Sequence, residues 1–107
     1  MSAFVVGLVT CSSRGEARKI ARAILEKKLA ACVNIIGGLE SHYCWKNKLE
    51  NAQEWLVLIK TTRPRVRAVM TAVKAAHSYE VPEVIFVTVT EGERRYLNWI
   101  QACVKPK

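Results

Sequence analysis

The residue types best suited to chemistry in this chain are its cysteines and histidines. The four cysteines, Cys11, Cys32, Cys44 and Cys103, include no C-x-x-C pair, and we expect reduced thiols. Cys11 is predicted to end a strand just before a helix begins, where the positive helix end lowers the pKa of a thiol and makes it a better metal ligand. The alternative is a small buried hydrophobe, because free cysteine is among the most buried residue types. For Cys32, inside an apolar run, the core interpretation is stronger still.

The two histidines occupy different settings. His42 and Cys44 lie two apart on one predicted strand face and could offer an imidazole and a thiolate to copper or zinc, but two ligands do not make a site. His77 follows the apolar stripe of a predicted helix, where a histidine is more often a hydrogen-bonded end of the core. The stretch 77–83 still combines an imidazole, a phenol and two carboxylates with the stiff Pro82, which is as typical of a binding loop as of a connector.

Composition and motifs exclude several function classes. The chain has 107 residues, a formal charge of +8 and 50% hydrophobic residues, as expected of one domain spanning 1–107. All nine acidic residues are Glu, which excludes an EF-hand loop and a paired-Asp site. No Walker loop, G-x-G-x-x-G, H-E-x-x-H or G-x-S-x-G occurs, and we expect no enzyme. No segment approaches the roughly 20 apolar residues of a membrane span, so we expect a cytoplasmic protein without a membrane partner.

Hydrophobic periodicity predicts four strands and three helices. Ser13 and Glu16 form a capping box at the start of the first helix, which we expect to run to about Lys28. Pro64 is predicted to be the first residue of the second helix. The expected strands are 4–9, 32–45, 55–59 and 84–89, and the expected helices are 13–28, 64–77 and 96–104.

The order β-α-β-β-α-β with a final helix predicts an α+β fold, the ferredoxin-like split βαβ sandwich with helices on one face of the sheet. Gly37 and Gly38 predict a bulge in a long strand, and a tight turn at 46–48 completes a hairpin. We expect Trp55 to meet Tyr43 and Trp45 in that hairpin, at a subunit interface or a ligand groove. The other sheet face has too few polar residues to lie in water, so another subunit should cover it.

The charge also raises the possibility of a nucleic-acid partner. RNA-recognition domains of this fold expose aromatic side chains on their central strands, whereas the first and fourth strands here offer Val, Ile and Leu with a single Phe each. The basic excess falls mostly on helix faces that water can solvate. We therefore expect no nucleic-acid partner.

Six segments in register resemble the CutA divalent cation tolerance family: Thr10–Ser13, Leu29–Asn34, Tyr43-x-Trp45, Leu58–Thr61, His77–Glu83 and Tyr96–Ile100. The resemblance covers nearly the whole chain and implies a ferredoxin-like homotrimer related in architecture to PII-type signalling proteins. It also implies a metal-responsive protein, with Cys11, Cys32 and His77 as candidate ligands of copper or another soft divalent cation. Ser12 and Ser78 stand where the family usually has proline, and we expect looser loops there.

The resemblance further implies a cleft between subunits for a small molecule or an unknown protein partner. Its expected lining is Tyr43, Trp45, Lys60, Tyr79, Glu80 and Glu83. The alternative function is therefore a PII-like regulatory module that binds a small effector in this inter-subunit cleft. With Lys60 as its cation, we expect that effector to be an anion.

Overall fold

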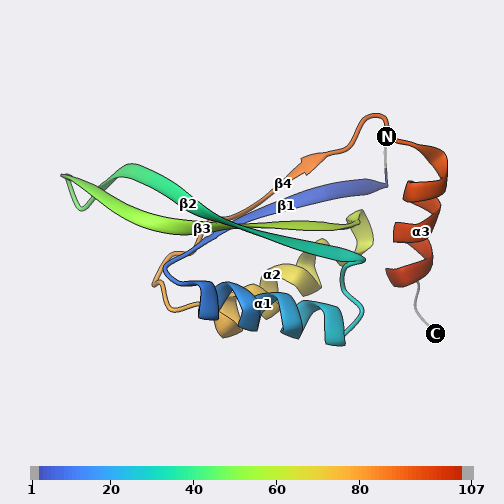
Figure 1. Ribbon diagram of the computed structural model, residues 1–107, viewed down its shortest axis with the longest axis horizontal. Coiled ribbons are helices and arrows are strands. Elements are labelled where there is room, and N and C mark those ends of the chain that lie inside the picture. Colours follow the sequence, from blue (N-terminus) through green and yellow to red (C-terminus); the bar gives the residue numbers. More distant parts are fainter. Residues whose placement is uncertain (1–2, 105–107) are drawn as a thin grey trace.

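A four-stranded antiparallel sheet and three α-helices make up the fold (Figure 1). The computed structural model describes residues 3–104. The strands are β1 (Phe4–Cys11), β2 (Cys32–Trp45), β3 (Lys48–Thr62) and β4 (Val84–Thr88), and the helices are α1 (Arg14–Glu26), α2 (Val66–Ala76) and α3 (Arg94–Val104). A 3-10 turn, η1 (Arg63–Arg65), precedes α2.

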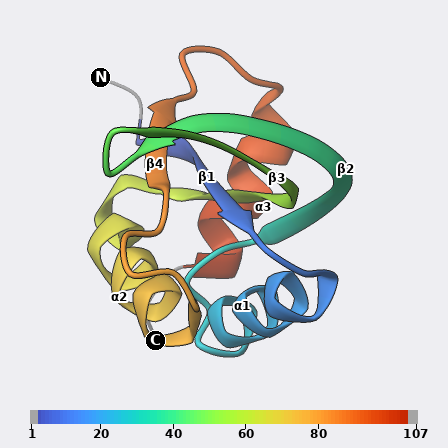
Figure 2. The ribbon, with the colours of Figure 1, turned by 90° about the vertical axis from the view of Figure 1, so that its left-hand side faces the viewer.

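The strand order β2-β3-β1-β4, with every pairing antiparallel, confirms the predicted ferredoxin-like α+β fold. Helices α1 and α2 lie side by side under one face of the sheet (Figure 2). Helix α3 stands at one end of the sheet, and the β2–β3 hairpin projects from the other end (Figure 1). The ends of β1 and α2 and the start of α1 meet on the hairpin side.

The core lies between the sheet and the two helices. Strand β1 alternates strictly, so that Val5, Val9 and Cys11 are buried, and Val9 and Cys11 share one core cluster with Ile20 and Ile24 of α1. Full burial of such side chains is worth about 1.5–3 kcal/mol each.

The opposite sheet face is covered by neither α1 nor α2 (Figure 1). Val6 and Leu8 of β1 face this side, and on the edge strand β4 Ile85 and Val87 are 52% and 50% exposed. Lys60, which pairs with Val6, also lies on this side, so the face is mostly but not wholly apolar. We call it the open face.

Most element boundaries differ from the prediction by a few residues, and three of the differences have a clear physical reason. Helix α1 ends at Glu26, because Lys28 adopts a left-handed φ of 57°, so no basic residue lies in its last turn. Pro64 belongs to η1, and α2 begins only at Val66. Strand β3 begins at Lys48, because its polar first half pairs with β2 through the backbone and needs no apolar pattern.

The hairpin contains the predicted bulge and turn. The β2–β3 register shifts between Ile36 and Leu39, where Gly38 has a φ of 82°, and Lys46 and Asn47 both have positive φ, as in the favoured two-residue turns. The predicted contact of Trp55 with Tyr43 and Trp45 is wrong. Trp55 pairs with Cys11 and its indole lies against Gly37, where a Cβ would be 2.9 Å from Nε1.

Candidate metal centre and the adjoining groove

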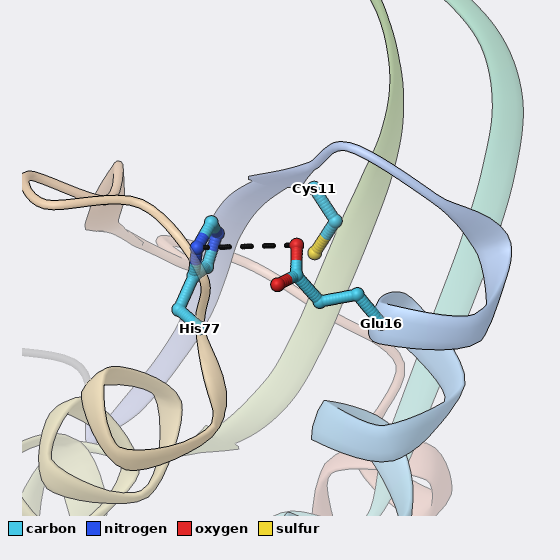
Figure 3. Close-up of side chains that lie close together, drawn as sticks. All are labelled: Cys11, Glu16 and His77. Atoms are coloured by element: carbon cyan, nitrogen blue, oxygen red, sulfur yellow. Dashed lines mark ion pairs between the residues drawn. The ribbon is translucent and has the colours of Figure 1, made fainter.

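Three side chains with metal-binding atoms converge where β1, α1 and α2 meet. Cys11 is the last residue of β1, Glu16 lies in the first turn of α1, and His77 directly follows α2. The Sγ atom, a carboxylate oxygen and a ring nitrogen all lie within 4.8 Å of one another (Figure 3). We call this trio the metal centre.

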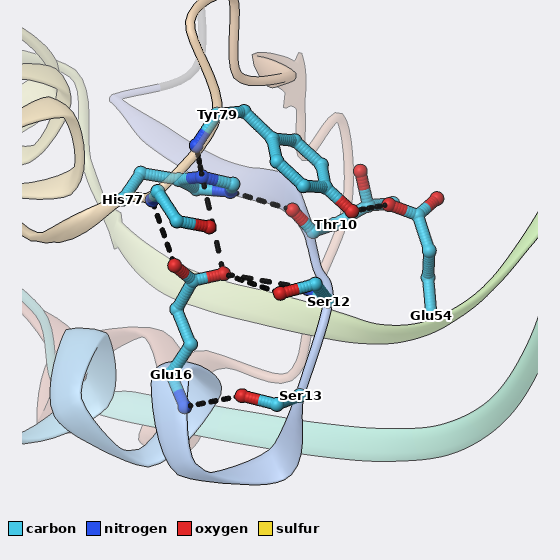
Figure 4. Close-up of polar contacts among 8 residues, drawn as sticks. Thr10, Ser12, Ser13, Glu16, Glu54, His77 and Tyr79 are labelled. Carbon is cyan, nitrogen blue, oxygen red and sulfur yellow. Dashed lines mark hydrogen bonds and ion pairs between the residues drawn. The ribbon is translucent and has the colours of Figure 1, made fainter.

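Hydrogen bonds to the backbone hold His77 in one orientation. Its side chain is fully buried, and Nε2 lies 2.7 Å from the carbonyl oxygen of Thr10 (Figure 4). Nδ1 accepts the backbone N–H of Tyr79 at 3.1 Å, so the proton of the neutral ring resides on Nε2, which donates to Thr10. A donor bond from one ring nitrogen to a backbone carbonyl is how proteins orient metal-binding histidines. Nδ1, 4.0 Å from Oε1 of Glu16, is therefore the nitrogen available to a metal.

Glu16 connects two loops. Its backbone N–H donates to the Ser13 hydroxyl at 3.1 Å, which confirms the predicted capping box, while its carboxylate accepts the N–H groups of Ser12 at 3.3 Å and Ser78 at 2.7 Å (Figure 4). Burial alone would raise the pKa of Glu16, but these hydrogen bonds and nearby His77 together lower it. The loops at Ser12 and Ser78, where looser chain was expected, are both bound to the same carboxylate.

The pKa of the Cys11 thiol is shifted upward, whereas the sequence predicted a lowered pKa. Burial, assisted by the negative charges of Glu16 and Glu54, raises the pKa of Cys11 to about 12. These effects outweigh the helix end, so the group is a neutral thiol at physiological pH. A bound cation would reverse the balance, because a metal displaces the thiol proton outright.

The trio fits a soft or borderline cation. Sulfur, imidazole nitrogen and carboxylate oxygen are ligands for zinc and copper, at metal–ligand distances of about 2.0–2.3 Å. Neighbouring ligands in a tetrahedral site are then about 3.4–3.8 Å apart, so the trio needs closure by about 1 Å. His77 would also have to release the Tyr79 amide.

The structure does not bring Cys32 to this centre. On β3 the neighbour of Cys11 is Trp55 and that of Cys32 is Lys60, five positions further along, a separation of roughly 17 Å. An odd number of positions also reverses the side of the sheet, so Cys32 lies on the open face. His42 and Cys44 are both exposed, and Nε2 of His42 is 2.6 Å from Oε2 of Glu40.

A groove adjoins the centre, between the β2–β3 hairpin and the loop 78–83. It consists of two hollows of about 530 and 480 Å³ that share Tyr43, Tyr79 and Val81. Other lining residues of this hairpin groove include Thr10, Glu40, Trp45, Glu50, Glu54, Glu80 and Glu83. Five of the six predicted cleft residues thus line it. The sixth, Lys60, lines neither hollow and lies with Cys32 on the open face.

A partly buried hydrogen bond joins two residues that line the groove. The hydroxyl of Tyr79 donates to Oε2 of Glu54 at 2.6 Å (Figure 4). Burial and this carboxylate raise the pKa of Tyr79, and burial and the charge of Glu54 raise the pKa of Glu83. Sequence reasoning missed Glu54 and gave Glu16 only a capping role, because a Glu in a strand arm or a helix cap carries no local mark of its distant partner.

The known proteins that this chain resembles all belong to one family. The CutA1 divalent ion tolerance protein family matches residues 5–103. The divalent-cation tolerance protein CutA of Thermus thermophilus is 45% identical over 96 residues, which are 90% of this chain and 93% of that protein. Human protein CutA is 46% identical over 93 residues, 87% of this chain but 52% of that protein, so the chain spans about half of that relative.

Solved structures agree with this similarity. CutA from Xylella fastidiosa superposes with a TM-score of 0.94 at 38% identity and covers 97% of this chain and 100% of its own. CutA1 from Oryza sativa gives 0.94 at 37% identity, covering 99% of this chain and 97% of its own. An Arabidopsis thaliana relative is named chloroplastic, and a CutA structure from Archaeoglobus fulgidus is named periplasmic. None of the helices between residues 3 and 104 is long and apolar enough to cross a membrane.

Proposed function

Because this chain belongs to the CutA1 divalent ion tolerance family, we propose that it binds copper or another soft divalent cation as a metal-responsive trimer. The observation that carries the proposal is the convergence of Cys11, Glu16 and His77 within 4.8 Å. The proposal is of a binding protein rather than an enzyme.

Each residue of the metal centre has a distinct part in the proposal. Cys11 supplies the soft ligand and gives up its proton on binding, His77 offers Nδ1 while Thr10 holds its other nitrogen, and Glu16 adds a negative charge. Because binding displaces the Tyr79 amide from Nδ1, it would alter the loop that forms one wall of the hairpin groove. That coupling offers a physical route from metal binding to a response.

Anaerobic calorimetric titration with copper and with zinc tests the metal centre. We expect Cys11→Ser and Glu16→Gln to weaken binding by at least about tenfold. Cys32→Ser is the matched control, because that thiol lies on the open face, and we expect its affinity to be unchanged.

Two results would overturn this ligand set. One is equal affinity of the wild type and Cys11→Ser. The other is a loss of affinity in Cys32→Ser alone, which would place the metal between subunits at the open face instead.

The trimer and the location are also part of the proposal. The apolar open face, with Ile85 and Val87 half exposed, supports burial against copies of the chain. All four cysteines are free, which supports a reducing compartment such as the cytoplasm.

A second candidate function is PII-like regulation by a small effector held in the hairpin groove. It is favoured by one observation, that Tyr43, Trp45, Tyr79, Glu80 and Glu83 all line the same pair of hollows. Aromatic walls with a few convergent polar groups are typical of ligand sites.

A further inference from the structure

The acidic residues of this basic chain are concentrated in the hairpin groove. Glu40, Glu54 and Glu83 line one hollow and Glu50 and Glu80 the other, which is five of the nine acidic residues in a chain of net charge +8. No Lys or Arg lines either hollow, and the one basic side chain in their lining is His42, whose Nε2 is 2.6 Å from Oε2 of Glu40. The groove therefore has a charge opposite to that of the chain as a whole.

Glu54 shows that this charge is not merely a solvated surface. The residue is only 6% exposed, and within residues 3–104 no cationic side chain forms a salt bridge with it. Oε2 accepts the Tyr79 hydroxyl, whereas Oε1 has no hydrogen-bond partner among the described residues. Because no fully buried side-chain oxygen of those residues lacks a partner, Oε1 is not fully buried, and Glu54 lines the groove. A carboxylate so deeply buried is costly without a counter-charge.

The walls of the groove are aromatic. Tyr43 and Tyr79 border both hollows, and Trp45 borders the one that Glu50 and Glu80 line. The ammonium group of Lys46 already lies 5.7 Å from the centroid of the Trp45 ring, a cation–π distance. Aromatic faces beside carboxylates form the kind of cage that recognises organic ammonium groups.

We propose that the hairpin groove binds a small organic cation with two or more amino groups, of the di- or polyamine class. This rests on the second candidate function, that the groove is an effector site, and it replaces the anionic effector expected from the sequence. Lys60, the residue that suggested an anion, lines neither hollow and is six positions from Glu54 along β3, roughly 20 Å away.

The spacing of the carboxylates favours an extended cation over a metal ion. Among the described residues, only Cys11, Glu16 and His77 place three ligand atoms within 4.8 Å of one another. The carboxylates of the groove are spread over two hollows, so they cannot surround one compact ion. Several positive charges along a flexible chain can meet them one at a time.

Titration of the full chain with spermidine, followed by calorimetry, tests the proposal. We expect Glu83→Gln and Glu54→Gln each to weaken binding by at least about tenfold, and added salt to weaken binding in the wild type. Glu26→Gln is the matched control, since Glu26 is exposed on α1 away from the groove, and should bind as the wild type does. Circular dichroism checks that each variant is folded, and Glu83→Gln serves alone if Glu54→Gln unfolds.

The other outcomes separate this proposal from the effector site itself. Binding of citrate, lost in Tyr43→Ala, without binding of spermidine would overturn the cationic class and leave the effector site standing. Absence of binding by both probes would overturn both. If Glu26→Gln weakened spermidine binding as much as the groove variants do, the attraction would be unspecific. If Mg²⁺ bound more tightly than spermidine and the same variants weakened it, the ligand would be a metal ion. Either result would overturn the proposal of a polyamine ligand.

Discussion

Oε2 of Glu16 accepts the backbone N–H of Ser78 at 2.7 Å and joins the first turn of α1 to the loop after α2 (Figure 4). The other carboxylate oxygen accepts the N–H of Ser12. Both bonds use a backbone N–H, which proline at position 12 or 78 would lack. Glu16 therefore stabilises the metal centre through bonds that depend on a residue other than proline at each of these positions.

Replacement of Glu16 by Gln should destabilise the fold by about 1–2 kcal/mol at neutral pH, because charge-assisted hydrogen bonds to Ser12 and Ser78 become neutral ones. The folded-state pKa of Glu16 is lowered, so its contribution is present above the unfolded pKa and is lost as the pH falls through the folded one. The difference in free energy of unfolding between wild type and variant should thus shrink below about pH 4. Urea unfolding at fixed protein concentration, at neutral and acidic pH, measures this free-energy difference.

The control for this variant is Glu26→Gln on the exposed face of the same helix, where we expect a change within about 0.5 kcal/mol. A pH-independent difference between wild type and Glu16→Gln would contradict the assigned role of the charge.

The thiols should react with iodoacetamide in an order set by burial and pKa. With the pKa of Cys11 raised to about 12 from 9.0, its thiolate fraction at pH 8 is lower by a factor on the order of a thousand. Cys44, exposed in the hairpin, should be labelled first and Cys11 last. Mass spectrometry of timed samples gives the order, and the two sites should react alike in urea. Early labelling of Cys11 in the folded chain would show that the thiol is more ionised than its surroundings allow.

The phenyl ring of Phe86 occupies the space where Gly7 lacks a side chain. These residues are directly paired across β1 and β4, and a Cβ on Gly7 would lie 2.7 Å from the ring. We expect Gly7→Ala to cost about 1–3 kcal/mol. Gly15→Ala, in the first turn of α1 with only the Ser13 hydroxyl within 4.0 Å, should instead be neutral or stabilising by up to about 1 kcal/mol. Thermal unfolding of both variants compares them, and equal effects would refute this packing.

Local signals in the sequence sufficed for the fold. Ser13 and Glu16 predicted the start of α1 because a capping box lies within one helical turn. The glycines at 37 and 38 predicted the bulge because they lie at the bulge itself. The sheet order followed from the number and order of the elements. Such features depend on residues close together in the chain.

The candidate site could be predicted only in part, because its contacts join distant segments. Cys11 and Cys32 look alike as ends of apolar runs, and only the strand register reveals that they face opposite sides of the sheet. The bond between Tyr79 and Glu54 spans 25 positions, and the one between Glu16 and Ser78 spans 62. No periodicity in the sequence marks either partner.

Removal of the Tyr79 hydroxyl should destabilise the fold at the groove. In Tyr79→Phe the buried Oε2 of Glu54 loses its partner, and we expect a cost of about 1–3 kcal/mol. A double-mutant cycle with Glu54→Leu isolates the pair, because once the carboxylate is gone the hydroxyl has nothing to satisfy. Additive effects in urea unfolding would contradict a coupled pair. Tyr96→Phe, at an exposed phenol of α3, is the matched control.

The open face should control assembly. Val87 is 50% exposed on the edge strand β4. The substitution Val87→Glu would place a charge on the open face, and burial of an unpaired charge in a subunit contact is costly. We expect the wild type to have the mass of a trimer in light scattering and Val87→Glu to dissociate to smaller species, with a lower Tm because assembly stabilises the fold. Leu25→Glu, at a 41% exposed position of α1 on the helix layer, is the matched control and should remain trimeric. Dissociation by Leu25→Glu alone would instead assign the subunit contact to the helices and leave the open face to another partner.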